Sequence, residues 1–297
     1  MEPEISVIIV SWNVRELLRR AIASLERFAD VPFELFVIDN ASLDGTREFL
    51  AAGVSLDNPL CVRVRVIQNN RGRGFARATN QGLSESRAPY ALLFAPDAEL
   101  HPRALSALLQ AARRAPNIGV VGGQILNADG SLQTSIANLP TVWTHIGGRL
   151  RLHKLFPASE RLQRSLHPVF DYGREAGVPS VKGALFLITP LAKTKVGLLD
   201  ERFFIWFEET DYCARAAAAG LAVRYAPAAV ATHIGLASMK KMSFWSRQTI
   251  WNASLRKYFS KHYGLAAGLT LALLDPLLVA LGLLLAKLAP ARGRRQN

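Results

Sequence analysis

The sequence predicts an α/β fold in which helices flank a mostly parallel central sheet. Short apolar runs at 5–10, 33–38 and 90–94 alternate with stretches of helical apolar spacing, which is the pattern of βαβ units. With 297 residues, half of them hydrophobic, the chain can bury one large core and still carry an appendage. We therefore expect a sheet domain over 1–242 and a helical extension over 243–297.

The elements of the first half follow in order. The expected strands lie at 5–10, 33–38, 61–67, 90–94 and 119–125. Helical patterns separate them near 17–25, after Gly45, near 75–86 and over 105–112. In sheets of this kind the ligand binds outside the carboxyl ends of the strands, where Asp39 and Asp97 fall. Either aspartate alone could be a helix cap or a turn residue, but together they favour a nucleotide crevice.

The second half is less regular. Residues 130–177 have no clear periodicity and no acid between 129 and 160, and we interpret them as an acceptor or lid loop. A further buried strand is predicted over Val181–Thr189, and Gly220 is placed to end a helix. Two short runs, 223–225 and 229–233, close the predicted core.

The stretch from Phe203 to Asp211 combines apolar and acidic residues. Four of its first five residues are aromatic and three of the next four are acidic. A carboxylate beside an aromatic surface that excludes water has a raised pKa, which suits a general base. The alternative is a helix N-terminus, where acidic residues complement the helix dipole. The local pattern fits both interpretations equally well.

The net charge of +13 is concentrated at the C-terminal end. Residues 1–211 hold 24 Lys/Arg and 22 Asp/Glu, whereas residues 212–297 hold 12 Lys/Arg and one acid, Asp275. Because this basic region adjoins apolar sequence, it points to an anionic membrane surface and not to a nucleic-acid partner.

The C-terminal extension has two parts. Residues 243–263 are aromatic and basic at helical spacing, which suits packing on the core or lying at a bilayer interface. Residues 264–289 contain twelve leucines, but Asp275-Pro276 divides them into pieces too short to cross ~30 Å of hydrocarbon. We therefore expect a membrane-embedded hairpin or an interfacial pair of helices, in preference to a single span.

Two features indicate the compartment. Cys61 and Cys213 each lie in an apolar run and are interpreted as buried thiols in a reducing environment. The N-terminus opens with two glutamates and lacks the basic start of a signal peptide. We expect the protein on the cytoplasmic side of the bacterial inner membrane, peripheral or monotopic.

Six motifs together resemble family 2 glycosyltransferases, most closely the rhamnosyltransferase-like branch. They are Val-Ile-Ile-Val-Ser-Trp-Asn at 7–13, Val-Ile-Asp-Asn-Ala-Ser-Leu-Asp-Gly-Thr at 37–46, Gly-Phe-Ala-Arg-Ala-Thr-Asn-Gln-Gly at 74–82, Ala95-Pro96-Asp97, Lys182-Gly183-Ala184, and 203–215. The resemblance covers about residues 4–262 in the correct order, and the apolar tail lies outside it.

The resemblance implies a GT-A fold, a dTDP- or UDP-sugar donor, Mg²⁺ or Mn²⁺, and inversion at the anomeric carbon. Asp97 would coordinate the metal, and His233 matches a position that completes the metal site in related enzymes, although a lone histidine after a strand is more often structural. The implied donor-binding residues are Val10, Ser11, Asn13, Asp39, Asn40, Asn70, Arg77, Asn80, Pro96, Asp97, Gly183 and Ala184.

Glu209 matches the base that takes the proton of the acceptor hydroxyl. Glu208 and Asp211 would orient the acceptor or the loop, unless they cap the following helix, and Arg215 could pair with one of them. The chain departs from the family pattern at Ala95, which cannot supply a polar contact, and at Glu209, where an aspartate is usual.

The expected function is metal-dependent, inverting transfer of a sugar, such as rhamnose or another deoxysugar, to a glycan or polyprenyl-linked acceptor. The reaction would serve the synthesis of a cell-surface polysaccharide. The alternative, suggested by Ala95, is a membrane-bound scaffold or nucleotide-sugar-binding protein without catalytic activity.

Overall fold

The computed structural model describes residues 1–162, 170–235 and 242–288. The chain forms two compact units, which are described separately below. The sheet unit comprises Met1–Ala137 and Asp171–Trp251, and the helical unit comprises Asn138–Phe170 and Asn252–Asn297. Part of the predicted lid region, 130–177, thus belongs to the same unit as the C-terminal helices. The predicted boundary between a sheet domain and a helical extension at residue 242 stays a prediction.

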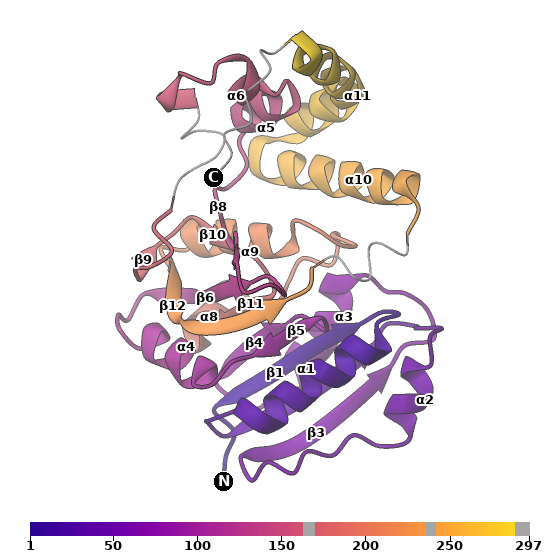
Figure 1. Ribbon diagram of the computed structural model, residues 1–297, viewed down its shortest axis with the longest axis vertical. Coiled ribbons are helices and arrows are strands. Elements are labelled where there is room, and N and C mark those ends of the chain that lie inside the picture. The colour runs from indigo at the N-terminus through magenta and orange to yellow at the C-terminus, as the bar shows by residue number, and fades with distance from the viewer. Residues whose placement is uncertain (163–169, 236–241, 289–297) are drawn as a thin grey trace. The chain divides into compact units, whose positions relative to one another are not determined.

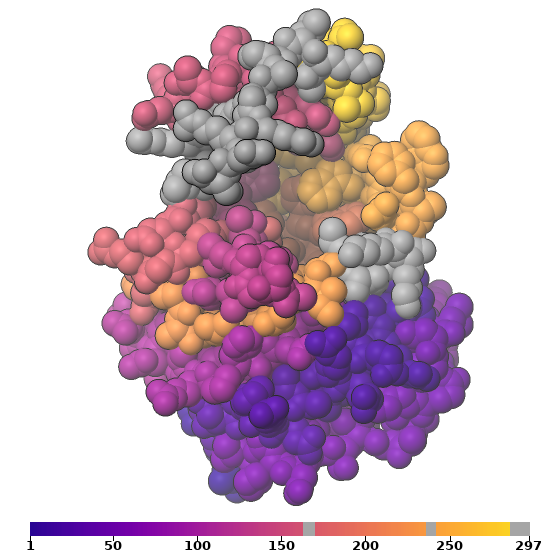
Figure 2. Space-filling model, viewed as in Figure 1, coloured from indigo at the N-terminus to yellow at the C-terminus, as the bar shows by residue number. Residues whose placement is uncertain are grey.

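The first half of the sheet unit is a parallel α/β arrangement (Figure 1). Its strands, in spatial order, are β3 (Cys61–Gln68), β2 (Phe33–Asp39), β1 (Ile5–Ser11) and β4 (Tyr90–Phe94). The connecting helices are α1 (Arg15–Phe28), α2 (Thr46–Ala51) and α3 (Phe75–Glu85). In Figure 2 the indigo and purple segments of these elements form one continuous surface of the unit. All residues of β1 and β2 are buried, because helices cover both faces of the sheet.

The second half continues the same sheet with mixed strand directions. After β4 the order is β11, β6, β12 and β5, with β7 paired to β6 and β9 to β12. The bounds of the strands are β5 Ala98–Leu100, β6 Ile118–Leu126, β7 Leu132–Gln133, β8 Ile136–Ala137, β9 Ala176–Gly177, β10 Ser180–Val181, β11 Leu185–Ile188 and β12 Ala222–His233. The helices are α4 (Ala104–Ala112), α8 (Pro190–Lys195) and α9 (Glu208–Ala218).

The predicted fold class is confirmed, but the sheet is partly antiparallel. Strand β11 runs antiparallel to both of its neighbours, β4 and β6. The predicted strand over Val181–Thr189 was wrong as a single element, because Lys182–Ala184 separates β10, which pairs with β8, from β11. Apolar runs in a sequence indicate burial, and they do not encode the direction in which a strand runs.

The core packs helices against both faces of the sheet. Leu18 and Leu25 of α1 and Leu105 of α4 are fully buried in one cluster with residues of β1 and β2. Helix α3 packs against β1 and β2, where a Cβ on Gly82 would press on Ile8. The strand ends are therefore held rigidly, which positions the polar residues that follow them.

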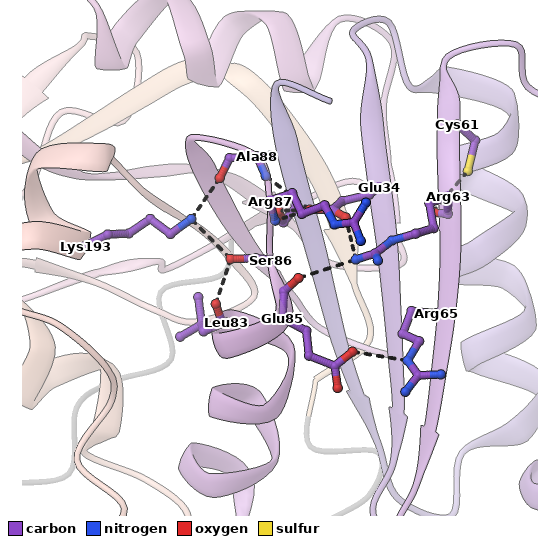
Figure 3. A network of polar contacts seen from close by, with 11 residues as sticks. Glu34, Cys61, Arg63, Arg65, Leu83, Glu85, Ser86, Arg87, Ala88 and Lys193 are labelled. Carbon is purple, nitrogen blue, oxygen red and sulfur yellow. Dashed lines mark hydrogen bonds and ion pairs between the residues drawn. The ribbon is translucent and has the colours of Figure 1, made fainter. Parts of the chain in front are cut away.

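A buried carboxylate joins the starting ends of several strands (Figure 3). The side chain of Glu34 in β2 is 1% exposed and accepts hydrogen bonds from Ser6 Oγ at 2.6 Å and Arg87 N at 2.7 Å. Arg63 of β3 donates to its second oxygen at 2.9 Å, and Lys193 of α8 binds the Ala88 carbonyl at 2.9 Å. Burial opposes ionisation of Glu34, but these hydrogen bonds outweigh it and lower its pKa.

We expect Glu34→Gln to lower the free energy of unfolding by about 2–3 kcal/mol at pH 7, measured by urea denaturation. Because the folded-state pKa of Glu34 is lowered, its contribution is present above the unfolded-state pKa and is lost as the pH falls through the folded value. The difference between wild type and variant should therefore shrink below about pH 4.5. Glu48→Gln, at an exposed glutamate, is the matched control and should change stability by less than about 0.5 kcal/mol. An equal loss in both variants would contradict this account.

The helical unit consists of α5 (Val142–Arg149), α6 (Leu152–Leu155), the later turns of α10 (Phe244–Tyr263) and α11 (Leu265–Leu288). Helix α11 packs against α5 and α6. It continues through Asp275-Pro276 without a break, so the prediction that these two residues divide the stretch into a hairpin or a pair of helices was wrong. Proline removes one backbone donor but does not prevent helix continuation where packing compensates. By length and composition, 265–285 of α11 could cross a membrane.

Candidate active site

The carboxyl ends of β1, β2 and β3 lie next to one another. The strand register places Ser11 beside Asp39, and Asp39 beside Gln68. Ser11 Oγ and Asp39 Oδ2 are buried and have no hydrogen-bond partner among the residues that the structure describes. A buried oxygen without a partner is costly, so the pair is suited to a ligand that carries hydrogen-bonding groups.

Two loops close over these strand ends. Asn13, in a left-handed conformation at φ 55°, accepts a hydrogen bond from Leu43 N at 2.6 Å, and its own N–H donates to Ser42 Oγ at 2.8 Å. Asn40 receives the Arg73 N–H at 2.9 Å, which ties the loop before α3 to the end of β2. Val10, the residue before Ser11 in β1, is buried.

Asp97 follows Pro96 in the turn after β4 and contacts a histidine from the last strand of the sheet. Its Oδ1 lies 3.2 Å from His233 Nε2, and its carbonyl accepts the Ile234 N–H at 3.0 Å. The other ring nitrogen, His233 Nδ1, lies 2.7 Å from Gln133 Oε1. Gln133 Nε2 donates to Asn127 at 2.8 Å and to the His233 carbonyl at 3.1 Å, so its Oε1 is the acceptor for Nδ1–H.

This hydrogen-bond pattern fits a divalent cation. Because Gln133 Oε1 accepts from Nδ1, the proton of a neutral His233 lies on Nδ1. The lone pair of Nε2 then faces Asp97 Oδ1. Two acceptors at 3.2 Å repel each other unless a proton or a metal ion lies between them. Neighbouring ligands of an octahedral ion with bonds of about 2.1 Å are separated by a similar distance. The described residues contain no cluster of three or more His, Cys, Asp or Glu side chains for a metal.

The aromatic and acidic stretch forms a strained turn and the start of α9. Trp206 and Phe207 both have left-handed backbone conformations, with φ of 66° and 72°, and α9 begins at Glu208. Trp251 of α10 packs against both rings, at centroid distances of 5.7 and 5.0 Å. Such strain persists only where the surroundings hold it, and it is frequent at functional sites.

Two adjacent carboxyl groups follow this turn. Burial raises the pKa of Glu208 well above its usual range, and the charge of Glu209 raises it further. Burial also raises the pKa of Glu209, but the charge of Lys182 and the backbone N–H of Gly183 favour its ionised form. Glu208 Oε2 is buried and has no hydrogen-bond partner within the described part of the chain. Glu209 is therefore the member of the pair that loses its proton first.

The backbone connects the glutamate pair to Asp97. The Ala184 carbonyl accepts the Ala95 N–H at 3.1 Å, two residues before Asp97. The backbone N–H of the neighbouring Gly183 donates a hydrogen bond to the Glu209 carboxyl group. The turn after β4 and the start of α9 therefore meet at residues 183–184, and the structure brings the carboxyl groups to one end of the sheet.

Other predicted site residues have protein partners in the structure. Asp211, fully buried, pairs with Arg215 at 2.8 Å, and Arg215 also binds the Val196 carbonyl at 2.7 Å. Arg77 pairs with Glu201 at 2.8 Å, and Asn80 binds the backbone of Leu199 through both groups of its amide, at 2.9 and 3.0 Å.

Asn70 is exposed, and its side-chain oxygen accepts a hydrogen bond from the Arg47 guanidinium group at 3.3 Å. The partners found for Arg77, Asn80 and Asn70 hold loops together, and no contact described by the structure places these three side chains beside Asp97. A role for them in donor binding stays a prediction.

Two residues near the site were missed as site residues. Lys182 was visible in the Lys-Gly-Ala motif, and burial lowers its pKa while Glu209 opposes that shift. Gln133 lies in the region interpreted as a lid, 100 positions from His233, and no local pattern marks it.

The chain belongs to glycosyl transferase family 2, whose family model matches residues 6–166. Together with the mixed α/β sheet and the polar residues at its strand ends, this defines the protein as a glycosyltransferase with a GT-A fold. The glycosyltransferase activity, the fold class and the rhamnosyltransferase-like resemblance predicted from the sequence are thereby confirmed.

Individual relatives agree with this assignment. The chain is 27% identical over 252 residues to the N-acetylglucosaminyl-diphospho-decaprenol L-rhamnosyltransferase of Mycobacterium tuberculosis, covering 78% of this chain and 76% of the relative. It is 24% identical to the low-salt glycan biosynthesis hexosyltransferase Agl10 of Haloferax volcanii, covering 73% and 62%. The structure of mannosyltransferase PcManGT from Pyrobaculum calidifontis, in complex with GDP-Man and Mn²⁺, aligns with a TM-score of 0.59 at 17% identity and covers 99% of this chain and 77% of that one.

Proposed function

We propose that this glycosyltransferase moves a sugar, such as rhamnose or another deoxysugar, from a dTDP- or UDP-sugar to a lipid-linked glycan acceptor. The proposal includes inversion at the anomeric carbon and dependence on Mg²⁺ or Mn²⁺. The observation that carries it is the convergence of Asp97, His233 and Glu209 at one end of the sheet. The name of the mycobacterial relative, which specifies a rhamnosyl group and a decaprenol-linked acceptor, supports the choice of substrates.

The donor would be held by the strand ends. Asp39 Oδ2, to which no described residue donates a hydrogen bond, would accept the ring N–H that uracil and thymine share, and Ser11 Oγ would bind the same base. Asp97 and His233 would hold the cation through an oxygen and a nitrogen. When bound, the cation would neutralise charge on the diphosphate leaving group.

Glu209 would act on the acceptor. Its carboxylate would accept the proton of the acceptor hydroxyl as that oxygen attacks the anomeric carbon from the side opposite the diphosphate. The charge of Lys182 and the Gly183 N–H favour the ionised form of this carboxyl and oppose the burial that raises its pKa. Glu208 would remain protonated, so that only one negative charge lies beside the attacking oxygen. The aromatic wall of Trp206 and Phe207 would exclude water that could otherwise hydrolyse the donor.

A thermal-shift screen of nucleotide sugars with and without Mn²⁺ tests donor binding. At a ligand concentration of 100 Kd, binding contributes about 2.7 kcal/mol, which raises the Tm of a protein of this size by about 4–5 °C. We expect the shift with dTDP- or UDP-sugars and only when Mn²⁺ is present. A shift confined to purine nucleotide sugars, or none with any donor, would contradict the proposal, and GDP-mannose serves as the comparison.

A further inference from the structure

The helical unit contains a polar cluster in the middle of its most apolar helix. Asp275 of α11 is 1% exposed, and its Oδ1 lies 2.8 Å from His145 Nε2 and 2.7 Å from Arg149 Nε. Burial of Asp275 opposes ionisation, but the hydrogen bond from His145 and the charge of Arg149 outweigh it and lower the pKa. This cluster, Asp275–His145–Arg149, fastens the centre of α11 to α5.

The buried face of α11 is fitted closely to its neighbours. Gly268, Leu271, Asp275 and Gly282 are buried at spacings of three, four and seven residues, which is one side of a helix. A Cβ on Gly268 would overlap Ser260 of α10, and a Cβ on Gly282 would overlap the Arg149 carbonyl at the end of α5. This face is therefore closed to any other partner.

The opposite face of α11 is a leucine surface. Leu269, Leu273 and Leu277 follow one another at four-residue spacing, with Leu273 77% and Leu277 66% exposed. The exposed leucines of α11 are Leu265, Leu269, Leu273, Leu274, Leu277, Leu281, Leu283 and Leu284. Soluble monomers rarely expose contiguous apolar surfaces of this extent, so the leucine surface calls for a partner.

The composition of the helical unit favours a lipid bilayer as this partner. The residues of the helical unit include 12 Lys/Arg and two acids, Glu160 and Asp275, which is ten of the net +13 of the chain. Lys154 of α6 is exposed, and so are the aromatic side chains of Trp143 and Phe156. Basic and aromatic residues bordering an apolar face are typical of helices that lie at an anionic membrane surface.

We propose that the helical unit is a monotopic docking module in which α11 lies along an anionic bilayer and inserts its leucine surface among the acyl chains without crossing. Crossing would carry Asp275 to the bilayer centre together with His145 and Arg149, or would break the cluster and leave a buried carboxylate unpaired. Either arrangement is costly, because charged groups in hydrocarbon are strongly disfavoured. This inference deepens the proposed function, since it names the surface on which a lipid-linked acceptor would be met.

Binding to vesicles tests the leucine surface in the full chain. Wild type should sediment with vesicles of phosphatidylcholine and phosphatidylglycerol, and bind at least about tenfold more weakly to phosphatidylcholine alone. The double variant Leu273→Asp/Leu277→Asp should lose at least about tenfold in partitioning to the anionic vesicles. Val62→Asp, at an exposed apolar residue of β3, is the control and should bind as wild type does. Unchanged partitioning of the double variant overturns the proposal. A second outcome also overturns it: the wild type is a dimer in lipid-free solution, and the double variant is a monomer that still binds the vesicles.

The topology of the wild-type chain provides a second test that does not depend on the folding of a variant. In sealed inside-out membrane vesicles, protease added outside should digest an epitope tag placed after Asn297 together with the sheet unit, because α11 does not cross. Protection of the tag would show that α11 spans the membrane and would overturn the proposal. An assay of sugar transfer in detergent, with a soluble acceptor, separates the proposed function from the proposed membrane docking. Absence of transfer there contradicts the proposed function, whereas vesicle binding and topology are measured without any transfer reaction and test the docking alone.

Discussion

Glu209→Gln is expected to lower the rate of sugar transfer by about 10²–10⁴-fold while donor binding is retained. The substitution keeps the size of the side chain and its hydrogen bond from Gly183, but an amide cannot accept the acceptor proton. Transfer is measured under saturating donor and acceptor, and donor binding by thermal shift with Mn²⁺. A rate within about threefold of wild type would show that another group is the base.

The matched control for this variant is Glu208→Gln, one position earlier in the same helix. Because burial and the charge of Glu209 raise the pKa of Glu208 and so favour its neutral form, the amide replaces a group of similar charge and should change the rate much less. The wild-type rate should rise with pH as Glu209 loses its proton, and this rise should disappear in Glu209→Gln.

Stability should change in the opposite sense to activity. The folded-state pKa values of both glutamates are raised, so between the ordinary glutamate pKa and the raised values the folded protein binds more protons than the unfolded chain. Ionisation with rising pH therefore destabilises the fold, and either substitution to glutamine should raise the Tm at neutral pH.

Asp97→Asn is expected to lower transfer by about 10²–10³-fold, corresponding to loss of several kcal/mol of charge stabilisation. The physical reason is that Asp97 is the carboxylate beside His233, and an amide oxygen is a much weaker ligand for a hard cation. Mn²⁺ binding is measured directly, by the electron paramagnetic resonance signal of the free ion in the presence of donor. The Mn²⁺-dependent thermal shift with donor should disappear as well.

Two further variants test whether the loss of Mn²⁺ binding is specific to Asp97 and His233. Asp57→Asn changes an exposed aspartate in the same way and should leave Mn²⁺ binding unaltered. Gln133→Leu removes the acceptor of His233 Nδ1–H and should weaken Mn²⁺ binding by about 10–100-fold, as losses of such supporting hydrogen bonds do. Equal Mn²⁺ binding by wild type and Asp97→Asn would contradict a metal role for this residue.

Much of the fold and of the candidate site could be predicted from the sequence. Buried strands are apolar runs, and helices repeat their apolar residues every three or four positions, so β1 to β4, α3 and α4 are found close to their predicted places. Asp39 and Asp97 were predicted to follow strand ends because a polar residue directly after an apolar run marks the place where the chain leaves the core. Glu208 and Glu209 were recognised by their acidic sequence next to four aromatic residues. The helix start is confirmed, since α9 begins at Glu208, and burial raises the pKa of both carboxyl groups, whereas the role of a general base stays a prediction.

What the tertiary structure decided depends on contacts between residues far apart in the chain. The tautomer of His233 depends on Gln133, and the order of proton loss within the glutamate pair depends on Lys182 and Gly183. Asp275-Pro276 was interpreted as dividing the apolar stretch, yet α11 continues through both residues, and His145 and Arg149 pair with the buried carboxylate. Local periodicity by itself determines which residues are buried and where strands end. The partner of a buried charge lies elsewhere in the sequence, so only the folded chain decides whether that charge breaks a helix, titrates or takes part in a site.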